Sequence, residues 1–339
     1  MSIRSLLLFL STLTLLIGEK GHCVKGTDLY PSISVENNPW FTGPLLSPSG
    51  YVISYGYCNF EPYVLATDTY AIYNRHWRPE SIPSSWDVTS LDPLWIGFAE
   101  KFDFFIFPQF NWGEVQGHSA TRFGDLALGV DIQILEEKLG KSRPAIKLVA
   151  RETIPTGKYQ KLNPDKLGAD ISGAGAYISS VGVVLARLFL IEKTHFLSTR
   201  FFLNYSIPTK VHVKGFNTFG GGYGTNGCVD PGNFLTTIAG FEYNLTRNWV
   251  FALDVQHIYT QKTRFKGYEG ITAFGSPAII GAPSSNQLSL APAIEYNFNE
   301  SVGIIGGVWF SIAGRNATDF VSAVLALNWF FSLRHPRSN

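Results

Sequence analysis

The sequence predicts an all-β fold, an antiparallel transmembrane β-barrel of about 12 strands (range 12–14) behind an N-terminal signal peptide. Three observations lead to this prediction. Apolar and polar residues alternate with a period of two in one stretch after another. Many of these stretches exceed the roughly 5–6 residues of a typical soluble strand and reach the roughly 9–11 needed to cross a bilayer. Short and long links alternate between them, as in bacterial barrels.

The composition agrees with a β-protein that has much surface away from water. Charged residues make up 16% of the chain, below the roughly 25% of soluble domains, and aromatic residues reach 14%. The net charge of +1 gives no electrostatic reason to expect a nucleic-acid partner. A large soluble β-sandwich or lectin-like domain has a similar composition, so composition alone leaves that alternative open.

Residues 1–23 have the layout of a secretory signal peptide. Arg4 supplies a positive charge, an apolar run follows over 5–17, and Gly21 and Cys23 are small residues at the −3 and −1 positions of a cleavage site. The apolar run is short for a transmembrane helix. A lipid anchor on Cys23 is the alternative, and the polar residues before it disfavour that interpretation.

Export leaves Cys58 and Cys228 in the mature chain, as a disulfide or as free thiols.

The sequence divides into parts of different character. We expect a signal peptide at 1–23, a periplasmic or lumen-inserted extension at 24–61, the outer-membrane barrel at 62–332 and a C-terminal tail at 333–339.

The alternation of apolar and polar residues predicts where the strands lie. We expect them near 62–75, 93–100, 102–112, 122–134, 145–154, 176–190, 196–207, 234–246, 248–260, 287–298, 301–313 and 318–332. The longer links, expected at the outer surface, are 76–92, 113–121, 155–175, 208–233 and 261–286. Aromatic residues gather near the strand ends, Phe196 and Trp249 at one end and Phe320 at the other, which predicts belts at the membrane interface.

The polar face of these strands predicts a hydrophilic lumen. The lumen-facing candidates for selectivity or binding are Asp125, Asp131, Lys147, Arg151, Arg200, Glu242, Asp254 and Glu295. A structural network of ion pairs and hydrogen bonds that fills a narrow barrel is the alternative, and we weigh it somewhat higher. About twelve strands lie between small, side-chain-filled barrels and wide porins, so a constricted lumen is expected.

One stretch carries a family resemblance. Gly124-Asp125 opens a strand, and the next strand leads into Pro155-Thr156-Gly157. This pattern resembles the outer-membrane transporter family named for the meta-cleavage pathway of phenol degradation (MetA-pathway of phenol degradation-like). That family is akin to the fatty-acid and aromatic-hydrocarbon channels of the outer membrane. The resemblance covers these two strands and implies passage or binding of a hydrophobic small molecule. It marks no catalytic residue.

No enzymatic site is expected. The pair His118-Ser119 is the one candidate for a barrel lipid hydrolase, and no acidic partner is placed beside it. The histidines are scattered, so the sequence predicts no metal site and no cofactor.

The leading hypothesis is therefore an outer-membrane channel for small hydrophobic or aromatic molecules, which pass through the barrel or bind in it. A structural or adhesin-like surface barrel is the alternative, and a barrel lipid hydrolase is a weaker one. The expected partners are outer-membrane lipid and lipopolysaccharide, a small hydrophobic solute, periplasmic chaperones and the barrel-insertion machinery, with no nucleic acid.

Overall fold

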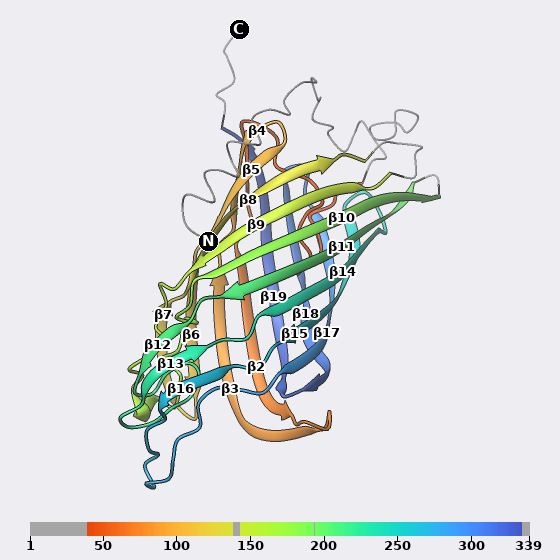
Figure 1. Ribbon diagram of the computed structural model, residues 1–339. Coiled ribbons are helices and arrows are strands. Elements are labelled where there is room, and N and C mark those ends of the chain that lie inside the picture. Colours follow the sequence, from red (N-terminus) through yellow and green to blue (C-terminus); the bar gives the residue numbers. More distant parts are fainter. Residues whose placement is uncertain (1–38, 138–142, 193, 334–339) are drawn as a thin grey trace.

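The chain closes into a β-barrel. The computed structural model describes residues 39–137, 143–192 and 194–333. Within them one antiparallel sheet forms a closed barrel of twelve strand crossings, as predicted (Figure 1). Strand β1 (Tyr57–Phe60) closes it by pairing with β19 (Ala317–Ser332) on one side and β4 (Leu94–Ala99) on the other. Closure leaves no unpaired edge there, which a lipid environment requires. Among the described residues, no helix has the length and apolarity needed to cross a membrane.

Most crossings are long continuous strands, and their positions agree with the predicted ranges to within a few residues. They are β9 (Ala145–Ile154), β10 (Ile178–Glu192), β11 (His195–Pro208), β14 (Phe234–Asn244), β15 (Trp249–Thr260), β17 (Ser285–Asn297), β18 (Val302–Arg315) and β19. Each pairs with its neighbours in the order of the sequence. The alternation therefore located these strands correctly.

The remaining crossings are each broken into two parts at a similar level of the wall. They comprise β1 with β2 (Tyr63–Tyr73), β4 with β3 (Pro79–Leu91), β5 (Phe102–Phe107) with β6 (Gln109–Val115), and β8 (Leu126–Leu135) with β7 (His118–Phe123). Pro62, Pro93 and Pro108 stand at three breaks, because proline has no N–H for the ladder. The ladder continues across them: Glu61 N, for example, donates to Pro93 O at 2.9 Å.

The links alternate in length, and two predicted long links are wrong. Residues 76–92 largely form β3, and residues 113–121 are the ends of β6 and β7 with a two-residue turn at Gln116 and Gly117. The long loops are 155–177, 209–233 and 261–284. They lie at the barrel end opposite β1 and the end of β19. In bacterial barrels long loops face outward, so we call this the outer end and the other the periplasmic end.

The outer loops have structure of their own. They carry a small sheet of β12 (Val211–Lys214), β13 (Asn226–Asp230) and β16 (Arg264–Tyr268), which lies at the lower end of the molecule in Figure 1. The loop 155–177 contains the short 3-10 helix η4 (Pro164–Lys166). Cys58 in β1 and Cys228 in β13 are free thiols.

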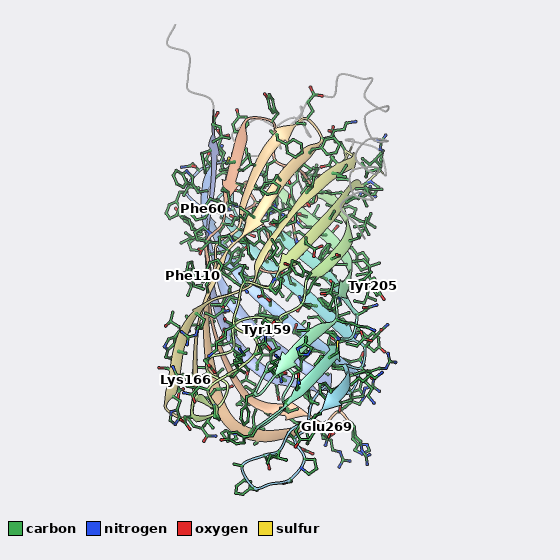
Figure 2. The ribbon with its side chains drawn as sticks, turned by 60° about the vertical axis from the view of Figure 1, so that its left-hand side comes forward. Phe60, Phe110, Tyr159, Lys166, Tyr205 and Glu269 are labelled. Atoms are coloured by element: carbon green, nitrogen blue, oxygen red, sulfur yellow. The ribbon has the colours of Figure 1, made fainter. Side chains whose placement is uncertain are left out.

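The outer wall is apolar. Large side chains such as Trp249, Phe110 and Tyr205 are exposed on it, and Figure 2 shows the latter two along the wall of the barrel. Two aromatic residues expected in the interface belts are not there. Phe196 is buried on the inner face of β11, and Phe320 is buried against Trp309 with ring centroids 4.8 Å apart. Without these two rings, the outer surface of the barrel still has the apolar character that contact with lipid requires.

Candidate functional site

The candidate site is the lumen, which the N-terminal part of the described chain enters. Residues 39–56, here called the lumen segment, precede β1 and contact the inner face of the barrel through many hydrogen bonds. Along β8, β15 and β17 the inward residues are mostly the polar or small ones that the alternation assigned to the lumen. The site is therefore built from the inner barrel face and the lumen segment together.

The lumen segment follows the inner circumference of the barrel. Thr42 N donates to Glu295 on β17 at 2.9 Å, and Leu46 N donates to Asp254 on β15 at 2.8 Å. Val52 N then donates to Gln133 on β8 at 3.0 Å. Finally Gly56 N donates to Gly97 O on β4 at 3.0 Å, just before the chain enters β1. The segment thus passes around most of the wall in the periplasmic half of the barrel.

Glycines on the wall make this close approach feasible. A Cβ at Gly240 would lie 2.2 Å from Ser47 Oγ, and one at Gly97 would lie 2.0 Å from Ser54 O. A Cβ at Gly303 would lie 2.6 Å from Thr42 Oγ1. Real Cβ atoms do not approach other atoms this closely, so larger residues at these positions would displace the lumen segment.

A chain of buried charges holds one end of the lumen segment. Lys147 Nζ lies 2.6 Å from Asp131 Oδ2, and both side chains are almost completely buried. Asp103 on β5 is the ladder partner of Asp131 on β8, so the two carboxyl groups face the lumen side by side. Asp103 Oδ2 accepts a hydrogen bond from Ile53 N at 2.6 Å. From the wall to the lumen segment, the groups therefore follow one another as a lysine, two carboxyl groups and the backbone N–H of Ile53.

The same order recurs on the other side of the barrel. Arg200 Nη2 lies 2.8 Å from Glu242 Oε2, and the Glu295 carboxyl lies near this pair. Glu295 in turn accepts from Thr42 N. Arg200 also donates to Ser47 O at 3.5 Å. A buried base and two carboxyl groups thus gather at each of two separate points where the segment is attached to the wall.

Further polar contacts complete the attachment. Gln133 Nε2 donates to Gly50 O at 3.2 Å, and Asn297 Oδ1 accepts from Thr42 Oγ1 at 2.7 Å. In the periplasmic link after β8, Glu137 accepts from Tyr51 Oη at 2.9 Å. Burial raises the pKa of the Glu137 carboxyl above its usual value.

Apolar and aromatic side chains line the inner wall between these polar groups. Phe105, Val149 and Val184 form one cluster, against which Trp95, Phe107 and Phe202 pack. A second cluster, which includes Leu45 of the lumen segment, gathers inward residues of β15, β17, β18 and β19, with Trp309 against it. The interior is therefore partly apolar, although the sequence predicted a mainly hydrophilic one.

Arg151 differs from the other lumen candidates. It shares the inner face of β9 with Lys147, but its side chain is exposed, and its guanidinium carbon lies 5.5 Å from the centre of the Phe107 ring. No carboxylate lies within ion-pair distance of it among the described residues. The structure pairs Asp131 with Lys147 and not with Arg151.

Asp125 serves a separate attachment at the break between β7 and β8. Its carboxyl accepts from Gly157 N at 2.9 Å and from Ala174 N at 2.7 Å, which ties down the loop 155–177. Thr156 Oγ1 donates to Gly124 O at 2.7 Å. The Gly-Asp and Pro-Thr-Gly stretches that carry the family resemblance are therefore in direct contact, as one hydrogen-bonded unit.

Sequence reasoning missed several residues that hold the lumen segment. They are Asp103, Gln133, Glu137 and Asn297. The alternation did contain a signal for Gln133, which shares a face with Asp131. Asp103 gave a weaker one, because its inward neighbours Phe105 and Phe107 are aromatic and hide the contrast between faces.

The chemistry that the described residues can perform is limited. No group of three or more His, Cys, Asp or Glu residues is placed to hold a metal ion in the described part of the chain. His118 and Ser119 lie in β7 at the outer end, and both are exposed. There they pair with the neighbouring strand β6.

Comparison with known proteins establishes the fold. No family model matches the sequence, and no curated protein matches it. The structure is similar to an outer-membrane channel from Pseudomonas putida F1, with a TM-score of 0.66 and 11% identity over 85% of this chain and 100% of that one. Weaker likenesses reach the NanC porin (TM-score 0.40, 8% identity, 79% and 98% covered) and a mutant of the monoaromatic hydrocarbon channel TodX (0.35, 11%, 82% and 91%). The chain therefore has the architecture of a bacterial outer-membrane β-barrel.

Proposed function

We propose that the protein is an outer-membrane channel for small hydrophobic or aromatic molecules, which pass through the barrel or bind in it. The observation that carries this proposal is the pair of apolar clusters inside a closed barrel, with Phe202 and Trp309 on different parts of the inner wall. A purely structural barrel of this size could be filled by polar networks alone. Apolar inner surface instead suits a solute that lacks hydrogen-bonding groups.

The lumen segment would then narrow the passage at its periplasmic half. The polar candidates pair with one another or bond the lumen segment, so we propose that they position the segment and select solutes only indirectly; they are Asp131, Lys147, Arg200, Glu242 and Glu295. Arg151, exposed on the inner face, is the member of the set best placed to meet a solute directly.

The resemblance of residues 122–157 to the phenol-degradation transporter family supports the same class of solute. The resemblance gives support and identifies no solute site, because the contact between Asp125 and Gly157 fixes a loop to the barrel wall. We propose lipopolysaccharide, periplasmic chaperones and the barrel-insertion machinery as partners on the strength of the architecture, and we propose no catalytic role.

An uptake assay tests the proposal. Cells that express the protein are compared with cells that carry an empty vector and with cells that express an unrelated twelve-stranded barrel at equal level. We expect faster uptake of radiolabelled toluene and unchanged uptake of arabinose. Toluene uptake equal to both controls would refute the proposal.

An adhesin-like role is the second candidate, and one feature favours it. In the outer loop 261–284, Phe274 is 97% exposed and Ile279 is 85% exposed. Apolar residues that project this far suit contact with another surface. If deletion of 272–278 abolished cell adhesion while toluene uptake stayed at the empty-vector level, the adhesin role would replace the channel.

A further inference from the structure

The small sheet of the outer loops has an outward side that is rich in positive charge, and we call this side the basic face. Its side chains are Lys210, His212 and Lys214 at β12, Asn226, Cys228 and Asp230 on β13, and Arg264, Lys266 and Tyr268 on β16. Four of them are lysine or arginine and one is a carboxylate, so the net charge is +3 with His212 neutral. The next acidic residue along the chain, Glu269, comes after β16 has ended.

The strand pairing puts these side chains on one side of the sheet. His212 on β12 and Lys266 on β16 are both opposite Cys228 of the central strand. Lys214 lies two residues beyond His212 on β12. Paired residues, and residues two apart along a strand, project from the same side of a sheet. At the usual strand spacings their Cα atoms are about 7 to 10 Å apart, so one multiply charged group can contact several of them.

The other side of the small sheet is an apolar core. Val211, Val213 and Val229 are almost completely buried there. Tyr159 and Ile280 of the adjoining loops pack against them. The apolar side therefore faces the loops, and the basic face is held as a fixed array on the outside of the molecule.

The basic face continues the lipid-facing wall of the barrel. β12 follows β11, β13 precedes β14 and β16 follows β15, so the small sheet extends three neighbouring wall strands outward (Figure 1). Tyr205 and Ile207 near the end of β11 are 42% and 51% exposed on that wall.

The sequence distance gives the level of the basic face relative to the lipid. Lys210 comes three residues after Ile207, and Lys214 comes seven residues after it. At about 3.3 Å per residue and a tilt of about 45°, these lysines stand roughly 7 to 16 Å beyond the last apolar wall residue. That is the level of the lipid headgroups and of the sugars attached to them.

The cations of the basic face have little charge compensation within the protein. Lys210 lies 3.9 Å from Asp230, and both side chains are exposed. In the part of the chain that the structure describes, no carboxylate lies within 4.0 Å of Lys214, Arg264 or Lys266. An anionic partner would relieve the repulsion between these groups.

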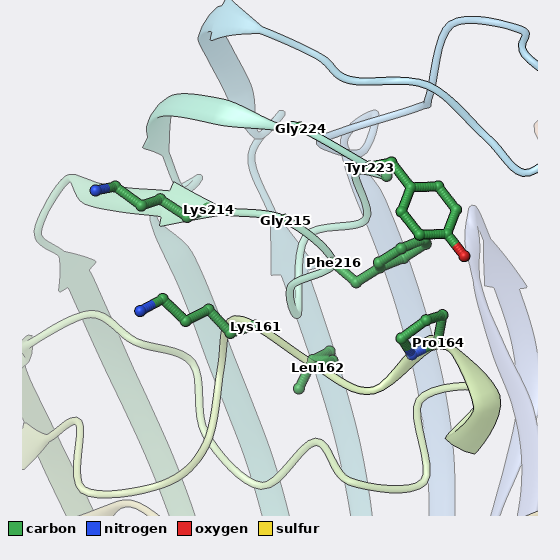
Figure 3. Close-up of a pocket in the computed structure, with 9 residues that line it drawn as sticks. Lys161, Leu162, Pro164, Lys214, Gly215, Phe216, Tyr223 and Gly224 are labelled. Carbon is green, nitrogen blue, oxygen red and sulfur yellow. The ribbon is translucent and has the colours of Figure 1, made fainter.

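Lys161 adds a further cation at the edge of the small sheet. Its backbone N–H donates to Lys214 O at 3.3 Å, and Gln160 Oε1 accepts from Lys214 N at 3.0 Å. Figure 3 shows the amino groups of Lys161 and Lys214 pointing the same way, away from the Tyr223 ring. The loop 155–177 therefore extends the positive charge of the basic face beyond β12.

We propose that the basic face binds the phosphate groups of lipopolysaccharide in the outer leaflet around the barrel. Lysine and arginine form strong charge-assisted hydrogen bonds with phosphate oxygens. The position of the face, on the wall side and next to the lipid-exposed strands, suits a phosphorylated glycolipid better than a soluble polyanion. The inference rests on the outer-membrane location and assigns a site to one partner proposed above, and it does not depend on the solute in the lumen.

Calorimetric titration of the purified full-length protein in detergent tests the proposal, with deep-rough lipopolysaccharide as the probe and phosphatase-treated lipopolysaccharide as its counterpart. We expect the untreated lipid to bind more tightly, and its affinity to fall as salt is raised. The double variant Lys214→Gln/Lys266→Gln should bind it at least about tenfold more weakly.

Arg75→Gln/Arg78→Gln is the matched control. It removes two exposed cations from the turn between β2 and β3, at the same end of the barrel but separated from the small sheet by β17, β18 and β19. The control should bind lipopolysaccharide as the wild type does, and heat-modifiable migration on gels confirms that each variant is folded.

Several results would overturn the assignment. They are equal affinity for treated and untreated lipid, wild-type affinity of the Lys214/Lys266 variant, and an equal loss of affinity in the Arg75/Arg78 variant. Displacement of the lipid by inorganic phosphate at the same concentration, or tighter binding of heparin than of the lipid, would also overturn it. Toluene uptake separates this proposal from the channel. Lipid binding without toluene uptake would refute the channel and keep the basic face, and uptake without lipid binding would do the reverse.

Discussion

The buried pair Lys147–Asp131 allows the arrangement in the lumen to be tested quantitatively. Its atoms are 2.6 Å apart, and the two side chains are 2% and 3% exposed. Lys147→Met removes the base and leaves Asp131 beside Asp103, with no compensating charge nearby. Loss of one partner from a buried ion pair costs about 3–5 kcal/mol. That corresponds to a reduction of roughly 150- to 4,000-fold in the ratio of folded to unfolded protein.

The double variant Lys147→Met/Asp131→Asn removes both charges and is the matched control. We expect it to recover part of the stability, because Asp131 is then no longer a buried charge without its base and Asp103 can still accept from Ile53 N. The free energy of unfolding is measured by urea titration in detergent at pH 8, with heat-modifiable gel migration as the readout. A loss below about 1 kcal/mol for the single variant, or a double variant as unstable as the single one, would refute the reasoning.

Other perturbations test separate contacts. Gly303→Val should push Thr42 off the wall and raise single-channel conductance in planar bilayers, whereas unchanged conductance would contradict the close approach. Asp125→Ala should free the loop 155–177 and speed its cleavage by trypsin severalfold, and wild-type cleavage rates would count against that role. Burial alone would raise the pKa of Asp170, but the hydrogen bond and charge of Lys158 hold that pKa below its usual range. The Asp170 contribution to loop stability is therefore present above the unfolded pKa of about 4 and lost as the pH falls through the lower folded value. Trypsin cleavage measured after brief acid exposure should rise in wild type, and Asp170→Asn should abolish that pH dependence.

The strands were predictable from sequence where one face meets lipid and the other the lumen. The prediction failed over 76–92, where the structure has β3. The outer part of β3 is exposed on both faces, so its sequence has no reason to alternate, and its serines and prolines indicate a loop. The short turn between β6 and β7 was missed for a similar reason, since β7 is exposed along most of its length.

The lumen could be predicted only in part. Asp131, Glu242, Asp254 and Glu295 were assigned to the correct face, because they alternate with large apolar residues. Their contacts could not be deduced, because they join positions far apart in the chain. Thr42 and Glu295, for example, are 253 residues apart in sequence.

The aromatic lining was hidden from sequence for another reason. Phe105 and Phe107 occupy inward positions next to outward apolar residues, so both faces of β5 look alike. Only closure of the barrel decides which face turns inward. The Gly-Asp and Pro-Thr-Gly motif, in contrast, was visible in sequence, but its meaning as a tie between a strand break and an outer loop became clear from the contacts of Asp125.

Toluene uptake by cells that express a lumen variant tests the central claim most directly, namely that hydrophobic solutes travel along the apolar inner wall. Phe202 packs against the cluster around Phe105, on the inner face of β11. The account predicts that Phe202→Arg lowers toluene uptake to the empty-vector level, while Phe202→Leu retains it and both variants keep heat-modifiable migration. Wild-type uptake by folded Phe202→Arg protein would contradict the account.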